Sequence, residues 1–405
     1  MNARFLRRSA ALIFALGLIT ACSDQPQTDT DTPDTVDPRY TLVDPNASDA
    51  TRALQRNLWS LTGEALLFGH QDSLAYGVTW FADPLRSDVH DVTGAFPAVY
   101  GWELGNLALG HEQNLDGVNF ANMQEWIRTG FRQGSIITLG WHMTSPVTGE
   151  DAWVRQPTVE HIIPGGAHHD ALKAYLDTLA DFVRTLTFED DVGQEQLIPI
   201  IFRPWHEHNG DWFWWGKGHV SERDFITLWR FTVNYLRDEK GLNNLLYAFS
   251  PDRSRTDLAN FEQDYFYAYP GDDYVDILGF DNYWDLGHAS NTTPTEQQMA
   301  DFVQSLDALG RIAAERQKLT ALTEAGQDTL TDANFYTERF LPGFLATDNT
   351  RRMVYTLVWR NANRDKEERD HFYAPYPDHP AAADFVDFYE HPFTRFNDGL
   401  PPLYQ

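Results

Sequence analysis

Two glutamates lie in segments whose residue types suit acid–base and nucleophilic chemistry. Glu207 stands in the run Arg203-Pro-Trp-His-Glu-His-Asn-Gly-Asp-Trp-Phe-Trp-Trp-Gly216, and Glu324 stands in Thr323-Glu-Ala-Gly326. Cleavage of a glycosidic bond needs two carboxyl groups, because one protonates the leaving oxygen while the other attacks the anomeric carbon or activates water. The four tryptophans around Glu207 could stack on sugar rings. This pair is therefore the first candidate for a catalytic site.

Short apolar runs rich in β-formers alternate along the chain with longer segments of helical periodicity. Apolar residues recur at helical spacing in 123–131, 172–186 and 225–236, and further helices are expected at 295–315, 332–345 and 381–389. Eight strands alternating with helices predict a parallel sheet, and in a domain of this length a closed (β/α)8 TIM barrel. An open doubly wound sheet is the alternative, but no Gly-x-Gly-x-x-Gly motif follows the first strand. The expected strands are 66–71, 98–104, 135–142, 198–206, 244–251, 276–283, 319–325 and 353–360.

The carboxyl ends of these strands would meet at one mouth of the barrel, where active sites of this architecture lie. Strands four and seven face each other across the mouth, which would bring Glu207 and Glu324 together. A structural ion pair between Glu207 and Arg203 is the other interpretation. The ends of five other strands are also polar or aromatic, at His70-Gln71-Asp72, Trp102-Glu103, Trp141-His142, Asp281-Asn282-Tyr283-Trp284 and Trp359-Arg360.

The composition disfavours some partners and permits others. The 405 residues carry 31 basic and 59 acidic side chains, a formal charge of −28, which would repel the phosphate backbone of nucleic acid. Aromatic residues make up 14% of the chain and include 13 tryptophans. About half of these rings are expected in the core, and the excess suits stacking on a neutral sugar polymer.

The N-terminus reads as a targeting segment. Residues 1–21 have a basic start and an apolar run over 10–19, too short to span a bilayer, which needs about 20 residues. The run ends in a lipobox-like Leu18-Ile-Thr-Ala-Cys22, so we expect a lipoprotein signal peptide and lipidation of Cys22; a chance cysteine after an ordinary signal peptide is the alternative. Cys22 is the only cysteine, so no intrachain disulfide can form. Ser23 after it is typical of outer-membrane sorting.

These features predict three segments and a location. Residues 1–21 would be removed, residues 22–38 would form a lipidated flexible linker, and residues 39–405 would form the catalytic domain. The protein would then be a bacterial outer-membrane lipoprotein, attached through its lipid alone, with its catalytic domain in the periplasm or on the cell surface.

The run 203–216 closely resembles the acid/base signature of glycoside hydrolase family 26, a mannanase family in the clan of retaining (β/α)8 hydrolases. The likeness extends from Phe68-Gly-His-Gln71 to Trp359-Arg360. It implies that Glu207 is the general acid/base and Glu324 the nucleophile, with carboxyl groups about 5–5.5 Å apart. It also implies that Tyr283 hydrogen-bonds the nucleophile. Substrate-binding roles are implied for His142, Trp153, His206, Trp212, Tyr283, Trp359 and Arg360.

By this resemblance the chain would be a β-mannanase, of the endo-1,4-β-mannosidase or mannobiohydrolase type, and we expect it to be a monomer. It would act on mannan, galactomannan or manno-oligosaccharides by double displacement, without a cofactor. Members of the same family that cut mixed-linkage β-glucan or β-1,3-xylan remain alternatives. So does a catalytically inactive, glycan-binding surface lipoprotein.

One loop bears on whether the enzyme would cut at chain ends or within the chain. The segment 106–117 after the second strand contains Leu115 and Asp116 and is long enough to close one end of a cleft, where it would bind a terminal sugar and favour release of mannobiose. An ordinary solvated loop is the alternative.

The sequence His206-Glu-His208 lacks the spacing of a zinc motif, and alternate strand residues point to opposite faces, so no metal is expected.

Overall fold

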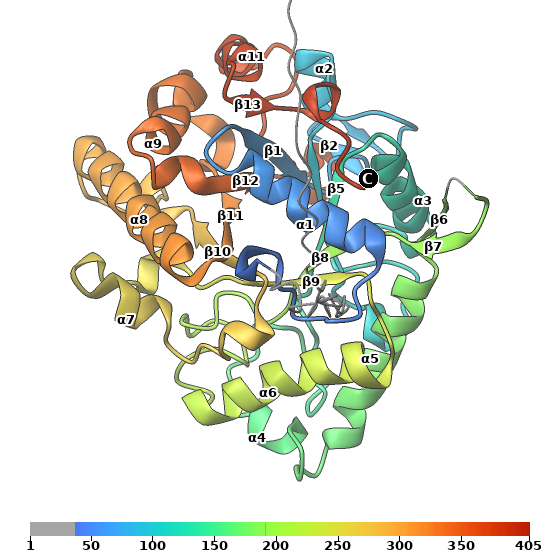
Figure 1. Ribbon diagram of the computed structural model, residues 1–405. Coiled ribbons are helices and arrows are strands. Elements are labelled where there is room, and N and C mark those ends of the chain that lie inside the picture. The colour runs from blue at the N-terminus through green and yellow to red at the C-terminus, as the bar shows by residue number, and fades with distance from the viewer. Residues whose placement is uncertain (1–36, 191) are drawn as a thin grey trace, which may run out of the picture. The chain divides into compact units, whose positions relative to one another are not determined.

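A closed barrel of eight parallel strands forms the centre of the computed structural model, which describes residues 37–190 and 192–405. The strands follow one another around the barrel in chain order, and β12 pairs with β1 to close it (Figure 1). A ninth short strand, β13 (Thr394–Arg395), pairs with the start of β1. The barrel strands are β1 (Leu66–Gln71), β4 (Val99–Glu103), β5 (Ile136–Gly140), β8 (Ile200–Arg203), β9 (Leu245–Phe249), β10 (Ile277–Asn282), β11 (Leu319–Ala325) and β12 (Met353–Val358).

All eight predicted strands are present, so the predicted TIM barrel with a single catalytic domain is confirmed. The main difference in bounds is at the fourth strand, which ends at Arg203 instead of continuing to residue 206. Trp205 and Glu207 have φ angles of 52° and 53°, and this left-handed backbone cannot continue a strand. Two hairpins outside the barrel were not predicted: β2 (Tyr76–Gly77) with β3 (Trp80–Phe81), and β6 (Thr187–Glu189) with β7 (Glu195–Leu197).

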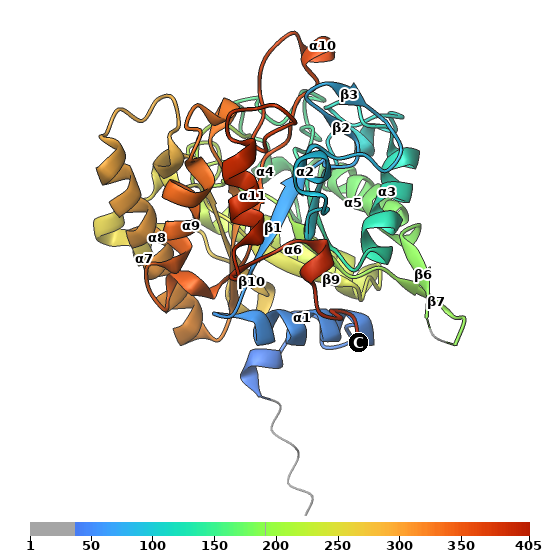
Figure 2. The ribbon, with the colours of Figure 1, turned by 90° about the horizontal axis from the view of Figure 1, so that it is seen from above.

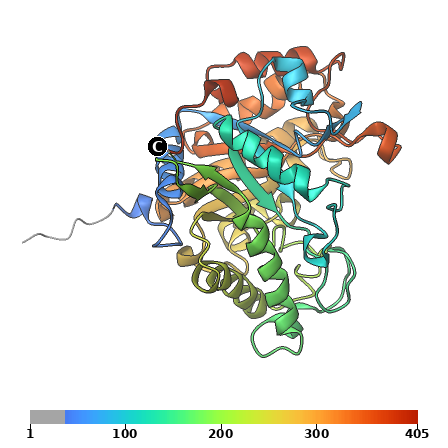
Figure 3. The ribbon, with the colours of Figure 1, turned by 90° about the vertical axis from the view of Figure 1, so that its right-hand side faces the viewer.

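Amphipathic helices cover the outside of the barrel, and Figure 3 shows α3 and α5 lying over the strands. In α5 the buried stripe is Leu172, Leu176, Leu179 and Val183, the spacing that one helix face requires. The expected helix over 332–345 is instead a π-helical turn, Phe335–Phe340, followed by α9. The helices are α1 (Asp49–Leu61), α2 (Asp88–Thr93), α3 (Phe120–Arg132), α4 (Val159–Ile162), α5 (His169–Arg184), α6 (Glu222–Asn234), α7 (Phe261–Tyr265), α8 (Thr295–Arg316), α9 (Leu341–Leu345), α10 (Arg364–Glu367) and α11 (Ala382–Glu390).

The two ends of the barrel differ. At the amino ends of the strands, Leu54 and Leu58 of α1 join the apolar cluster formed by strand residues such as Leu67 and Ile136, and so close that end. Figure 2 shows α1 at one end and the β2–β3 hairpin with α10 at the other. The end that is left for a site is therefore the one where the strands terminate.

Several predictions fall outside the described part of the chain. The signal peptide over 1–21, the lipidated Cys22 and the linker as far as residue 36 lie outside it. Within residues 37–190 and 192–405, no helix combines the length and the apolar character needed to cross a membrane.

Candidate active site

Glu324 is held by two donors at the mouth of the barrel. It lies near the end of β11 and is 4% exposed. The Arg203 guanidinium donates to Oε1, and the Tyr283 hydroxyl donates to Oε2 at 2.8 Å. Each oxygen of this carboxyl group thus accepts a hydrogen bond, one of them from a cation.

Arg203 also binds a second carboxylate. Its Nη1 donates to Asp281 Oδ2 at 2.9 Å and to Ser250 Oγ at 3.1 Å. Thr323 donates to the other oxygen of Asp281 at 2.6 Å. Burial raises the pKa of Asp281 well above its usual value, although the Arg203 charge opposes that shift. One guanidinium thus serves both Glu324 and Asp281, so the alternative of an Arg203–Glu207 ion pair does not hold.

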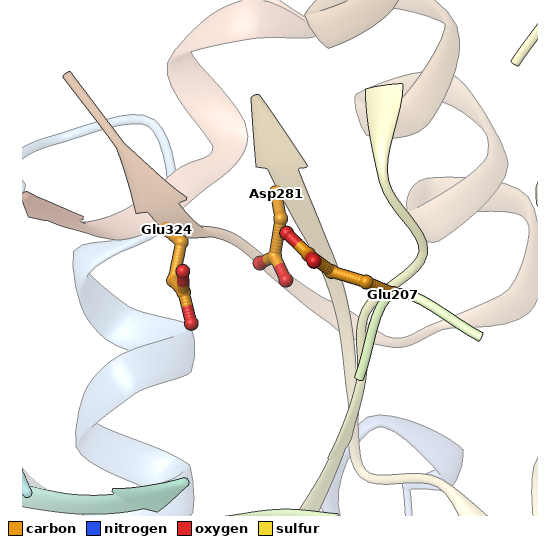
Figure 4. A group of neighbouring side chains, drawn as sticks. All are labelled: Glu207, Asp281 and Glu324. Atoms are coloured by element: carbon orange, nitrogen blue, oxygen red, sulfur yellow. The ribbon is translucent and has the colours of Figure 1, made fainter. Parts of the chain in front are cut away.

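Glu207 approaches the same place from the other side of the mouth. It lies just beyond the end of β8, and its backbone N–H donates to the Ser250 carbonyl at 2.8 Å. Figure 4 shows its carboxylate directed toward Asp281, with Glu324 on the neighbouring strand. One carboxylate oxygen from each of Glu207, Asp281 and Glu324 lies within 4.8 Å of the others. The structure therefore brings the two predicted catalytic glutamates together.

The surroundings of Glu207 favour its protonated form. Its only side-chain hydrogen bond among the described residues is from the Trp212 indole N–H to Oε2, at 2.7 Å. Burial raises the pKa of Glu207 well above its usual value, and the nearby carboxylates of Asp252, Glu324 and Asp281 raise it further. A carboxyl group that keeps its proton near neutral pH can act as a general acid.

His142 and His206 lie side by side near this pair. The backbone N–H of His142 donates to Glu103 Oε1 at 2.9 Å, and its Nδ1 lies 2.7 Å from Glu103 Oε2. Its Nε2 lies 3.2 Å from Nε2 of His206. Burial lowers the pKa of His142, but Glu103 more than offsets this and the pKa is raised, whereas burial and the Arg203 charge lower the pKa of His206. The arrangement fits a charged His142 that donates to a neutral His206.

Two cavities flank the glutamates. The Arg360 cavity, of about 510 Å³, extends along one side, and the Asp252 cavity, of about 500 Å³, extends along the other. The first is lined by Leu115, Asp116, His142, Trp153, Trp359, Arg360, Glu367, Arg369 and His371. The second is lined by Glu207, Trp212, Asp252, Ser254, Arg255, Tyr283, Trp284, His288 and Ser290. Glu207 lines the second cavity, as does Tyr283, the hydrogen-bond partner of Glu324, and we infer that the two cavities are parts of one cleft with the glutamates between them.

Aromatic rings line the Arg360 cavity. Trp153 stacks on His142 with ring centroids 5.1 Å apart and 10° between the planes, and its side chain is 46% exposed. Trp359 meets the His142 ring near its edge at 6.1 Å. Flat apolar faces open to a cavity suit the C–H faces of sugar rings.

The far end of the Arg360 cavity is built by the loop after β4 together with Arg360. Arg360 Nη2 lies 3.1 Å from Asp116 Oδ1, and its Nη1 donates to Glu367 at 2.6 Å. The other oxygen of Asp116, Oδ2, is buried and has no hydrogen-bond partner among the described residues. Leu115 lines the same end and is 38% exposed. The loop residues singled out from the sequence thus do reach the cleft.

Some residues of the site were not predicted. Glu103 was predicted only as the end of a strand. Its role as the partner of His142 follows from the pairing of β4 with β5, since His142 lies just after β5. Asp252 was not predicted, although it follows the end of β9. The sequence Ser250-Pro-Asp252 at that end would have been the signal.

The same carboxylates have the spacing of a metal site. In the described part of the chain, Glu207, Asp281 and Glu324 form the one group spaced as metal ligands are. Arg203 donates to two of the three, so a guanidinium supplies the positive charge there. His208 lies apart, stacked on Phe225 with its Nε2 2.8 Å from the Tyr267 carbonyl oxygen.

Comparison with known proteins gives consistent matches. The family model for glycosyl hydrolase family 26 matches residues 43–333. A mannan endo-1,4-beta-mannosidase of Bifidobacterium adolescentis is 34% identical over 334 residues, 79% of this chain. The matched part is 32% of that protein, so the chain spans about a third of its length.

Solved structures match over most of the chain. A GH26 beta-mannanase from Bacteroides ovatus is 38% identical with a TM-score of 0.79, and the match covers 88% of this chain and 98% of that one. An endo-beta-1,4-mannanase from Cellulomonas fimi is 34% identical with a TM-score of 0.79, covering 90% of this chain and 79% of that one.

Proposed function

The chain belongs to glycosyl hydrolase family 26, and on that basis we propose that it hydrolyses β-1,4-mannosidic bonds in mannan, galactomannan or manno-oligosaccharides with retention of configuration. The observation that carries the proposal is the approach of Glu207 and Glu324 to within 4.8 Å, oxygen to oxygen, at the centre of the cleft. Retaining glycosidases place their carboxyl groups about 5–5.5 Å apart, whereas inverting enzymes leave about 6.5–9.5 Å for a water molecule. The similarity to a mannan endo-1,4-beta-mannosidase and to a GH26 beta-mannanase supports mannan as the substrate.

The contacts assign the two roles. Glu324, positioned by Arg203 and Tyr283, attacks the anomeric carbon, and its bond to the sugar forms as the glycosidic bond breaks. Glu207 transfers its proton to the leaving oxygen in this step. It then takes a proton from the water that attacks the glycosyl-enzyme, which releases Glu324 and restores the starting state.

The two cavities then bind opposite parts of the substrate. Glu207 lines the Asp252 cavity, so the leaving part of the chain lies there, within reach of the acid. The Arg360 cavity receives the sugars that become bound to Glu324, with Trp153 and Trp359 against their apolar faces. His142, fixed by Glu103 and facing His206, contributes its ring to the wall of the Arg360 cavity.

The test is a time course of products from mannan, galactomannan, lichenan, β-1,3-xylan and mannopentaose. Release of manno-oligosaccharides, with the β-anomer formed first in proton NMR, supports the proposal. Preferred cleavage of lichenan or of β-1,3-xylan would replace mannan as the substrate. Binding of mannan without any release of reducing sugar would indicate a glycan-binding protein instead.

A finer proposal concerns the mode of cleavage. Asp116, whose Oδ2 has no hydrogen-bond partner among the described residues, and the neighbouring Leu115 line the Arg360 cavity, where Asp116 would accept a hydrogen bond from a hydroxyl of a terminal sugar and Leu115 would pack against that sugar. The enzyme would then release mannobiose from chain ends. The double variant Leu115→Gly, Asp116→Ala should lower the share of mannobiose among early products and speed the loss of viscosity of galactomannan. An unchanged product profile would contradict this mode.

We also propose that the protein is a bacterial outer-membrane lipoprotein, with its catalytic domain in the periplasm or on the cell surface. This location is supported by the lipobox-like sequence that ends at Cys22 and by the polar segment that follows it. Metabolic labelling with a palmitate analogue should mark the full-length protein in a bacterial host, and Cys22→Ser should abolish the label and release the protein from the membrane fraction. Labelling that survives this substitution would contradict lipidation at Cys22.

A further inference from the structure

The four carboxyl groups at the centre of the cleft are unequally supplied with positive charge. Glu324 and Asp281 both bind Arg203. Glu207 and Asp252 have no Lys or Arg nitrogen within 4.0 Å in the described part of the chain, yet both line the Asp252 cavity. Two carboxyl groups that share a site without a cation disfavour each other's ionisation, so the pair retains a proton that either group alone would lose.

Asp252 is held in place by neutral groups. Its Oδ1 accepts the Ser254 backbone N–H at 2.7 Å and the Ser254 hydroxyl. Its Oδ2 has no hydrogen-bond partner among the described residues, although Asp252 as a whole is only 7% exposed. A nearly buried carboxylate with one free oxygen toward the cavity projects its charge onto the other groups there.

Asp252 is also tied by its backbone to the loop of the acid/base. Its N–H donates to Asn209 Oδ1 at 2.7 Å, and its carbonyl accepts the Asn209 Nδ2–H at 2.8 Å. Asn209 follows Glu207 by two residues, in the segment that departs from the β8 strand with positive φ angles. The reciprocal pair of hydrogen bonds fixes the strained Glu207 loop to the end of β9.

The nearby cations are engaged elsewhere. Arg253 binds Asp285 at 2.7 Å, and Arg255 binds Asp211 at 2.8 Å. Both lower the pKa of Asp252 only in part, since burial raises it to about 6. The other charged or titratable groups facing the pair are Arg203, Asp281, Tyr283 and Glu324.

We propose that Asp252 is a positioning residue for the acid step: it holds the Glu207 loop through Asn209, and its carboxylate keeps the proton on Glu207 until the leaving sugar takes it. This inference rests on the proposed function. The negative charge of Asp252 opposes deprotonation of Glu207, and so extends the acid form of the enzyme to higher pH. It makes no bond to the reacting atoms.

The test is the pH profile of kcat/KM for Asp252→Asn, which keeps the shape and the Ser254 contact but removes the charge. The alkaline limb reports loss of the proton from Glu207 in the free enzyme. Removing a neighbouring negative charge lowers the pKa of Glu207, so on mannotetraose this limb should move to lower pH by about one unit. Ser254→Ala takes away a hydrogen bond that favours ionised Asp252, and it should give a smaller shift in the same direction.

A substrate with an activated leaving group separates this role from others. Departure of 2,4-dinitrophenolate from an aryl β-mannobioside needs no proton, so kcat/KM for this substrate should change less than about twofold in Asp252→Asn. An equal loss on both substrates would mean that Asp252 serves the fold or the nucleophile, and would overturn the proposal. An alkaline limb that stays in place on mannotetraose would also overturn it.

Asp276→Asn is the matched control. Asp276 is another buried carboxyl group whose pKa burial raises to about 6, but it accepts the backbone N–H groups of Val43 and Tyr247, away from the cleft. It should alter thermal stability without moving the alkaline limb. If the wild type cleaves neither mannotetraose nor the aryl mannobioside, the proposed function fails; if it cleaves both and the limb does not move in Asp252→Asn, only this inference fails.

Discussion

The two sides of the active site hold their carboxyl groups in opposite ways. On the β11 side, Glu324 lies within the strand, and Arg203 and Tyr283 donate to its two oxygens. On the β8 side, Glu207 lies on a loop with a φ angle of 53°, and one indole N–H is its only side-chain donor among the described residues. A nucleophile must be ionised and an acid must be protonated, so the same residue type needs donors and a cation on one side and few donors on the other.

Removal of Glu324 should have the largest effect. Glu324→Ala should lower kcat/KM on the order of 10⁴-fold or more for both mannotetraose and the aryl mannobioside, because no bond to the sugar can form. Azide should restore part of the activity on the aryl substrate and give the α-mannobiosyl azide, since it attacks from the side that Glu324 occupied. A β-azide, seen by NMR, would place the nucleophile elsewhere.

Removal of Glu207 should separate the two substrates. Glu207→Ala should lower kcat/KM for mannotetraose by about 10²–10⁴-fold, the usual contribution of a general acid, and leave that for the aryl mannobioside within about tenfold. Azide should here yield the β-azide, because it intercepts the intermediate bound to Glu324. Equal losses on both substrates in steady-state kinetics would contradict the acid assignment.

Removal of the hydrogen bond from Tyr283 to the nucleophile Glu324 should have an intermediate effect on kcat/KM. Tyr283→Phe removes the donor to Glu324 Oε2, a hydrogen bond to a charged group and therefore one of about 1.5–3 kcal/mol. The expected loss of kcat/KM is about 10- to 100-fold on both substrates, with no shift of the alkaline limb. A loss of kcat/KM confined to mannotetraose would mean that Tyr283 supports the general acid Glu207 and not the nucleophile Glu324.

Removal of the hydrogen bond from Trp212 to Glu207 should have the smallest effect, and it should shift the alkaline limb in the direction opposite to that expected for Asp252→Asn. The Trp212 N–H stabilises ionised Glu207 and thus lowers its pKa, although burial and the carboxylates outweigh it. Trp212→Phe keeps an aromatic face and removes the donor, so the alkaline limb of kcat/KM should move to higher pH by less than about one unit. A shift to lower pH would show that the indole does not act on the ionised form.

Prediction of the fold from the sequence succeeded where local pattern and architecture agree. Buried apolar runs separated by amphipathic helices led to all eight strands. Bounds failed at β8, where Trp205 and Glu207 adopt backbone angles that their residue types disfavour and that only the surrounding barrel imposes. The π-helical turn at Phe335–Phe340 is a similar case, because a helical period does not distinguish an α-helix from a wider turn.

For the site, the sequence by itself determined which residue types stand at the ends of the strands, and the order of the strands made Glu207 and Glu324 neighbours. Only the tertiary structure decided which of these side chains bind each other. Arg203 is four residues from Glu207, yet it binds Glu324 and Asp281, and Asp252, far along the chain, shares the cavity of Glu207. Charge acts through space at a few ångströms, and the distances across the barrel mouth follow from strand stagger and loop conformation, which no local pattern records.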